Sequence, residues 1–87
     1  MYNYQTEKKK IFTEEGQEMF LKIRDNVHLL LKQSGAVMMQ NAVRGVSGDS
    51  WVQLACVDRL VELKEIREIT KDNVAGQHRV FVNNQNN

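Results

Sequence analysis

Apolar side chains recur at steps of three and four from residue 13 to residue 33, which predicts a helix with one buried stripe. The stripe consists of Met19, Phe20, Ile23, Val27, Leu30 and Leu31. Thr13 precedes two glutamates and is suited to cap the first turn, because its hydroxyl accepts from a free backbone N–H. Gly35 follows the last turn and favours the left-handed conformation that commonly ends a helix.

The pattern continues with two shorter helices, one from residue 36 to about residue 44 and one from about residue 50 to residue 64. Gly45 and Gly48 bracket the turn between them, and three residues are suitable N-caps for the third helix: Ser47, Asp49 and Ser50. On a helical wheel, its apolar side carries Val52, Cys56, Leu60 and Leu63, widened by Leu54, Val57 and Val61. The opposite side carries Trp51, Ala55, Asp58, Arg59 and Glu62.

The helical period ends after Lys64, where the segments EIREIT and HRVFVN predict two strands joined by a loop that contains Gly76. A lone hairpin is marginal in water, so we expect this pair to pack against the helices. The expected fold class is mainly α with a small β-hairpin (α+β), within residues 12–83. Residues 1–11 are polar with three consecutive lysines, and we expect a flexible N-terminal tail there and a disordered C-terminal tail over residues 84–87.

Composition narrows the class of protein. A chain of 87 residues that is 41% apolar and 26% charged is typical of one small globular domain. No apolar run approaches the roughly 20 residues that cross a bilayer, so no membrane association is expected. The single cysteine cannot form an internal disulfide, and the polar N-terminus lacks the apolar region of a secretory signal. These features favour a cytoplasmic location.

The segment VDRLVELKEIREI, residues 57–69, carries a resemblance to a known family. Leu60 near the end of the third helix is followed six residues later by Ile66, which opens a strand. Together with three helices, a short turn between the last two and a hairpin, this pattern resembles the winged helix-turn-helix superfamily. Many members have Gly where this chain has Lys64 or Glu65, so we expect that turn to take another conformation.

The resemblance implies a three-helix winged helix-turn-helix domain whose third helix enters the major groove of DNA while the hairpin contacts the backbone. The matching DNA-binding candidates are Arg44, Ser50, Trp51, Gln53, Arg59, Lys71, His78 and Arg79. Gln53 and Arg59 have the donor geometry for adenine and guanine edges. Arg44, Lys71 and Arg79 suit phosphates.

Three of these residues have an alternative structural interpretation. Gln53 lies near the apolar arc and would then border the core. Arg59 would form a surface ion pair with Asp58 or Glu62, and Trp51 would pack against the first helix or the hairpin. The third helix region is also net negative, because residues 49–65 contain four acids and two bases.

The net charge of +1 gives little long-range attraction for phosphates, so any DNA binding depends on local clusters of cations. We expect a small regulator of transcription or replication that binds double-stranded DNA, as a homodimer that doubles the contacts. The alternative is a protein-interaction module that docks a partner protein around Trp51, Asp58 and Glu62. We expect neither an enzyme nor a cofactor or metal: the sequence has no phosphate loop or metal-ligand spacing, and Cys56 lies on the buried stripe.

Overall fold

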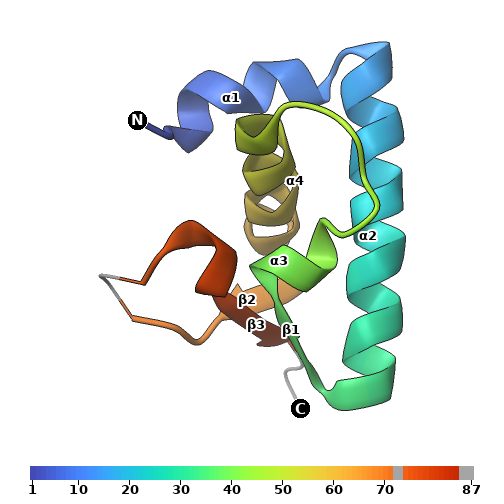
Figure 1. Cartoon of the computed structure of the whole chain (residues 1–87), viewed down its shortest axis with the longest axis vertical. Coiled ribbons are helices and arrows are strands. Elements are labelled where there is room, and N and C mark those ends of the chain that lie inside the picture. Colours follow the sequence, from blue (N-terminus) through green and yellow to red (C-terminus); the bar gives the residue numbers. More distant parts are fainter. Residues whose placement is uncertain (72–73, 85–87) are drawn as a thin grey trace.

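The structure is a computed structural model that describes residues 1–71 and 74–84 (Figure 1). In chain order its elements are α1 (Tyr4–Ile11), α2 (Glu14–Ser34), β1 (Ala36–Met38), α3 (Met39–Ala42), α4 (Ser50–Glu62), β2 (Ile66–Glu68), the 3₁₀ turn η1 (Gly76–His78) and β3 (Val80–Asn83). The strands form an antiparallel sheet in the order β1-β3-β2. The coarse prediction of a mainly helical α+β chain is therefore confirmed.

The ends of the two long helices follow local sequence signals. The Thr13 hydroxyl accepts from the backbone N–H of Gly16 at 3.0 Å, and Gly35 takes the left-handed conformation with φ 78° at the end of α2. At the start of α4, the Asp49 carboxylate accepts from the N–H of Trp51 at 2.8 Å and of Val52 at 3.3 Å. Asp49 is thus the cap among the three candidates.

The second predicted helix is shorter than expected. Residues 36–38 form strand β1, and the helix is reduced to the single turn α3. β1 pairs with β3, with Val37 opposite Phe81, and the N–H of Met39 donates to the carbonyl of Arg79 at 2.7 Å. Pairing with a strand more than 40 residues away overrides the local helical pattern, because buried Val37 and Phe81 both fill the core.

The prediction of a flexible tail over residues 1–11 is wrong. Residues 4–11 form α1, whose first turn is capped by Asn3 through a bond from the N–H of Thr6 at 3.1 Å. Ile11 is fully buried, and α1 packs against both α4 and α2 (Figure 1). At the other end, Asn84 donates to the carbonyl of Lys64 at 3.0 Å, and the rest of the predicted C-terminal tail lies outside the described residues.

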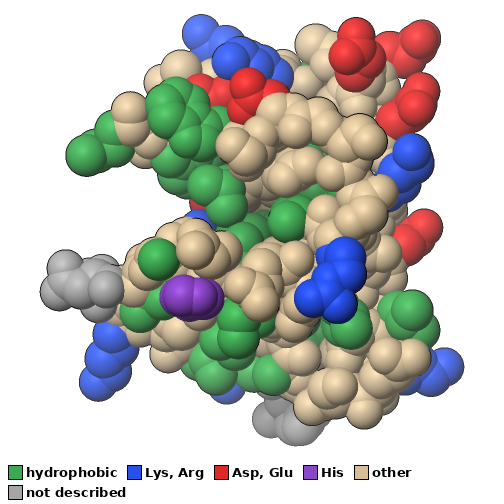
Figure 2. All heavy atoms as spheres, in the orientation of Figure 1, with side chains coloured by type: hydrophobic (Ala, Val, Ile, Leu, Met, Phe, Trp, Pro, Cys, Tyr) green, Lys and Arg blue, Asp and Glu red, His purple; other side chains and the backbone are tan. Residues whose placement is uncertain are grey.

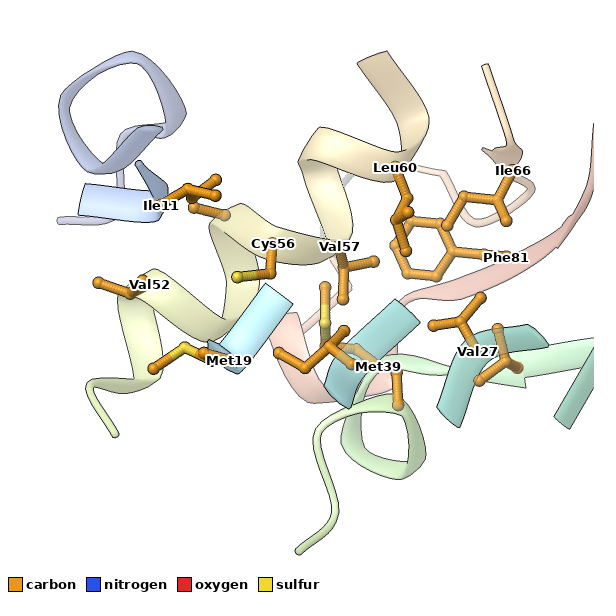
Figure 3. Packing of buried hydrophobic residues seen from close by; sticks show 14 of the residues in the cluster. Ile11, Met19, Val27, Met39, Val52, Cys56, Val57, Leu60, Ile66 and Phe81 are labelled. Carbon is orange, nitrogen blue, oxygen red and sulfur yellow. The ribbon is translucent and has the colours of Figure 1, made fainter. Parts of the chain in front are cut away.

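One core joins the helices to the sheet (Figure 3). Phe81 of β3 lies beside Leu60, Ile66 and Val27, while Cys56 and Val52 of α4 lie nearer Ile11 of α1. All seven side chains are at most 5% exposed. Burial in this apolar setting raises the pKa of the Cys56 thiol to about 12, so the thiol stays protonated and unreactive at neutral pH.

Two residues of α4 differ from their predicted positions. Ala55 was expected on the outer side but is fully buried, because α1 covers that side of α4. Leu63 was expected in the core but is 43% exposed, because the helix ends at Glu62 and Leu63 is its C-cap. The missed helix α1 therefore accounts for the first error, and the helix boundary for the second.

The turn between α4 and β2 also corrects an expectation. Lys64 adopts the left-handed conformation with φ 63°. Its N–H donates to the carbonyl of Val61 at 2.9 Å, and the N–H of Glu65 donates to that of Leu60 at 3.0 Å. This pair of bonds is the Schellman motif, in which glycine is the usual residue at the left-handed position. Lys64 thus makes the same turn that a glycine would make.

Candidate nucleic-acid interface

A groove of about 380 Å³ lies between the start of α4, α3 and η1. In Figure 2 the surface is hollowed between the part of the molecule that contains α1 and the β2–β3 hairpin below it. Its lining consists of Met39, Gln40, Val43, Ser50, Trp51, Gln53, Leu54, Gly76 and Gln77. None of these side chains is charged, and three of them are amides. The groove therefore offers a ligand apolar contacts and hydrogen bonds. Any charged contact must come from residues outside the lining.

The three predicted residues at the start of α4 lie together in this groove. Ser50 is exposed, and Trp51 is 42% exposed in the groove wall. Gln53 is partly buried, and its amide donates to the carbonyl of Val46 at 2.7 Å. That bond ties the turn before α4 to the helix and agrees with the alternative in which Gln53 borders the core. Ser50 and Trp51 are the more accessible pair.

Three of the predicted DNA-binding residues are exposed, namely Arg44, Lys71 and His78. Arg44 lies just after α3, where its guanidinium donates to the side-chain oxygen of Asn41 at 2.8 Å. Asn26 of α2 donates to the backbone carbonyl of Arg44 at 3.2 Å, which fixes this part of the loop. Lys71 lies beyond β2 and His78 ends η1, so both belong to the segment that joins β2 to β3.

Arg79 is not a free phosphate ligand. Its guanidinium donates to Asp58 at 2.8 Å and to the two oxygens of Glu68 at 2.8 and 3.0 Å. It also lies over the ring of Phe81 at 5.1 Å, and only 19% of the side chain is exposed. The bonds from Arg79 hold the pKa of the Glu68 carboxyl below its usual range. The predicted phosphate contact by Arg79 is therefore replaced by an internal role that ties α4 to the hairpin.

Arg59 is also engaged inside the molecule. It donates to Glu62 at 2.8 Å and lies over the ring of Phe12 at 5.4 Å, as the ion-pair alternative predicted. Glu62 accepts two more bonds from α1, from the hydroxyl of Tyr4 at 2.6 Å and from the ammonium of Lys8 at 2.9 Å. The hydroxyl of Tyr4, then Lys8 and Arg59, lower the pKa of Glu62 to about 2. Arg59 is thus removed from the set of base-reading candidates.

The acids of α4 were the main sequence argument against DNA, and their placement was not foreseen. Asp58 accepts from Arg79 and from the hydroxyl of Tyr2 at 2.6 Å, while Glu62 is held by α1. Neither carboxylate lines the groove at the start of α4. The sequence signals for this arrangement are Asn3 as a helix cap and the aromatic residues before Ile11, which mark the polar N-terminus as a helix that packs on another element.

Comparison of the chain with protein-family models, curated proteins and solved structures finds no match. Over residues 1–71 and 74–84, no helix combines the length and apolar character needed to cross a membrane. Over the same part of the chain, no cluster of three or more His, Cys, Asp or Glu residues is arranged to hold a metal ion.

Proposed function

We propose that this chain is a winged-helix protein that binds double-stranded DNA through the start of α4 and the segment between β2 and β3. The observation that carries the proposal is the distribution of charge along α4. Asp58 and Glu62 are engaged by Arg79, Lys8 and Arg59, whereas the first turn presents uncharged Ser50 and Trp51. Two acids of this helix are therefore paired away from the groove, and the exposed carboxylate of Asp49, which caps the first turn, is the acid that remains beside Ser50 and Trp51.

The arrangement of elements supports the same proposal. α2, α3 and α4 are followed by the β2–β3 hairpin, and a short loop separates α3 from α4. In helix-turn-helix proteins the N-terminal residues of the second helix of the motif contact base edges in the major groove. Ser50 and Trp51 stand in that position on α4, at the end of the helix where the backbone dipole is positive.

Exposed cations lie close in the chain to elements that line the groove, and they are suited to position a duplex. Arg44 follows α3, whereas Lys71 and His78 lie between β2 and β3. Contacts from Arg44 and Lys71 to phosphates fix orientation without reading sequence. Two such contacts give a small electrostatic term, so we expect weak binding by one chain and a shallow dependence on salt, with a slope of about −2 in log–log form.

Titration of the protein with a mixed-sequence duplex at several salt concentrations tests the proposal. Trp51 is the only tryptophan of the chain, so its fluorescence reports directly on the groove. We expect binding at low salt, and we expect Arg44→Ala and Lys71→Ala each to reduce the salt slope by about 1. Arg67→Ala is the matched control, because Arg67 is exposed and pairs with Val82 on the face of the sheet turned away from Phe81. Absence of duplex binding at low salt would refute the proposal.

A second candidate function is the docking of a partner protein in the same groove. The observation that favours it is the exposed ring of Trp51 in a lining without charge, since aromatic residues are enriched in protein interfaces. Under this alternative, Trp51→Ala abolishes capture of a protein partner, whereas Arg44→Ala and Lys71→Ala leave that capture unchanged. The duplex titration separates the two functions, because only the first gives binding that weakens as salt rises.

A further inference from the structure

The groove at the start of α4 contains an aromatic ring and several amides but no charged side chain. Trp51 is 42% exposed there, and the side chains of Gln40 and Gln77 are exposed beside it in the lining. A nucleotide divides in a similar way, because its base is uncharged and planar whereas its phosphate carries the charge. The composition of the lining therefore suits a base and not a phosphate.

The size of the groove limits which bases it can hold. Its volume of about 380 Å³ lies at the small end of the range for ligand pockets, which is about 300–1,000 Å³. A double helix is too large to enter, since its major groove alone is about 12 Å wide. Inside a duplex the faces of each base are also covered by its neighbours, so an indole ring can stack only on an unstacked base. Trp51 therefore fits a base at a strand end, in a bulge or in a single strand.

The amides of the groove match the edge of a base. A glutamine side chain offers both a donor and an acceptor, and this arrangement pairs bidentately with adenine. Gln40 lies in α3 and Gln77 in η1, so two of the elements that form the groove each supply an amide. Gln53 is held by its bond to the carbonyl of Val46. The groove thus combines a ring for stacking with side chains that can read a base edge.

The acid beside the groove also distinguishes a base from a phosphate. Asp49 caps α4 by accepting from the backbone N–H groups of Trp51 and Val52, and it is exposed. Its charge repels a phosphate placed beside Trp51, whereas a carboxylate can accept from the amino group of a base. The DNA backbone must therefore be contacted away from the start of α4.

We propose that the groove binds one unstacked base of the DNA, which stacks on Trp51 and forms hydrogen bonds with the groove amides. This inference rests on the proposed DNA binding and names the form of DNA that the site prefers. It predicts that the chain binds a duplex with an unpaired base more tightly than a fully paired duplex.

Fluorescence anisotropy with three labelled DNA molecules tests the inference on the full chain. The first is a blunt duplex, the second carries a single-stranded extension of three adenine nucleotides, and the third carries three abasic nucleotides of the same charge. We expect the adenine extension to bind at least about 5-fold more tightly than the abasic one, because stacking on an aromatic ring strengthens binding of a base by this factor or more. The adenine extension should also quench the fluorescence of Trp51, the only tryptophan of the chain.

Variants of the groove residues locate the contact. Trp51→Ala should reduce the ratio of the two affinities to about 1, and Trp51→Phe should keep most of it, because phenylalanine retains a ring for stacking. Gln77→Ala should lower the ratio at least about 2-fold through the loss of a hydrogen bond. Gln33→Ala is the matched control and should leave the ratio unchanged, since Gln33 is an exposed glutamine of α2 outside the groove. Circular dichroism of each variant establishes that the fold is kept.

The possible outcomes separate this inference from the proposed binding of double-stranded DNA. Equal affinity for the adenine and abasic extensions overturns the inference and leaves the groove to the protein partner of the second candidate function, even if the blunt duplex binds. A preference for adenine that Trp51→Ala leaves unchanged also overturns it, because the base would then lie elsewhere. A preference for adenine without binding of the blunt duplex supports the inference and overturns double-stranded binding. Failure of all three DNA molecules to bind overturns both.

Discussion

Lys64 is the residue whose identity fits its backbone conformation least well. A residue with a side chain loses about 1 kcal/mol in the left-handed region, because its Cβ approaches the following carbonyl oxygen. The two Schellman bonds at the end of α4 require this conformation, since β2 begins only two residues later. The sequence identified the position, because the family resemblance places glycine at Lys64 or Glu65. It did not show that Lys64 would accept the same geometry.

We therefore expect Lys64→Gly to raise the free energy of unfolding by about 1 kcal/mol, because glycine takes a positive φ without steric cost. Urea denaturation followed by circular dichroism measures the change. Lys22→Gly in the middle of α2 is the matched control and should lower the same quantity by about 1 kcal/mol, since that position is helical. A loss of stability in Lys64→Gly would contradict the assigned turn.

At the scale of elements, α1 is the part that sequence reasoning missed. Its residues are mostly polar, so the apolar periodicity that predicted α2 and α4 is absent. The helix is held by a few specific contacts with distant residues, such as Tyr2 with Asp58 and Tyr4 with Glu62. Such contacts join positions more than 50 residues apart, and no local pattern encodes them. By contrast, the caps at Thr13 and Gly35 are local, and both were predicted.

The junction of α1 with α2 is tested by Gly16→Ala. A Cβ at Gly16 would overlap the carbonyl oxygen of Lys10 and come within 2.7 Å of the Cα of Ile11, and both are backbone atoms that cannot move aside. We expect a loss of at least about 2 kcal/mol of unfolding free energy, even though alanine favours a helix by about 1 kcal/mol over glycine. Thermal and urea unfolding measure it. Lys22→Ala, at an exposed helical position, should change stability by less than about 0.5 kcal/mol.

The contacts of α1 also predict a loss of stability at alkaline pH. Burial, followed by the hydrogen bond to Asp58, raises the pKa of Tyr2 above its usual value, and burial with the bond to Glu62 does the same for Tyr4. Because the pKa is higher in the folded chain, this stabilisation is complete below about pH 10 and decreases as pH rises further. These are the only tyrosines, so tyrosinate absorbance should appear together with unfolding. Ionisation of both phenols in the folded chain would contradict the contacts.

At the scale of the whole molecule, hydrophobic pattern was enough to predict three helices, their order and the hairpin. It did not predict β1, because a strand of three residues is defined by its pairing with β3 and not by its own composition. It also did not predict how charge is distributed. The chain has 12 basic and 11 acidic residues, and the field at the start of α4 depends on which of them neutralise each other inside the fold. Arg79 is the clearest case, since it was expected at the surface and joins Asp58 to Glu68.

This placement of Arg79 gives a prediction that separates a positioning role from a phosphate contact. Arg79→Met leaves Asp58 and Glu68 without their shared cation, so the hairpin loses its link to α4 and duplex binding should weaken about 5-fold or more. The salt dependence of the remaining binding should keep its slope, because Arg79 neutralises carboxylates and releases no counterions from DNA. Arg44→Ala should instead reduce that slope by about 1. If Arg79→Met reduces the slope as much as Arg44→Ala, then Arg79 leaves the internal cluster to contact phosphate.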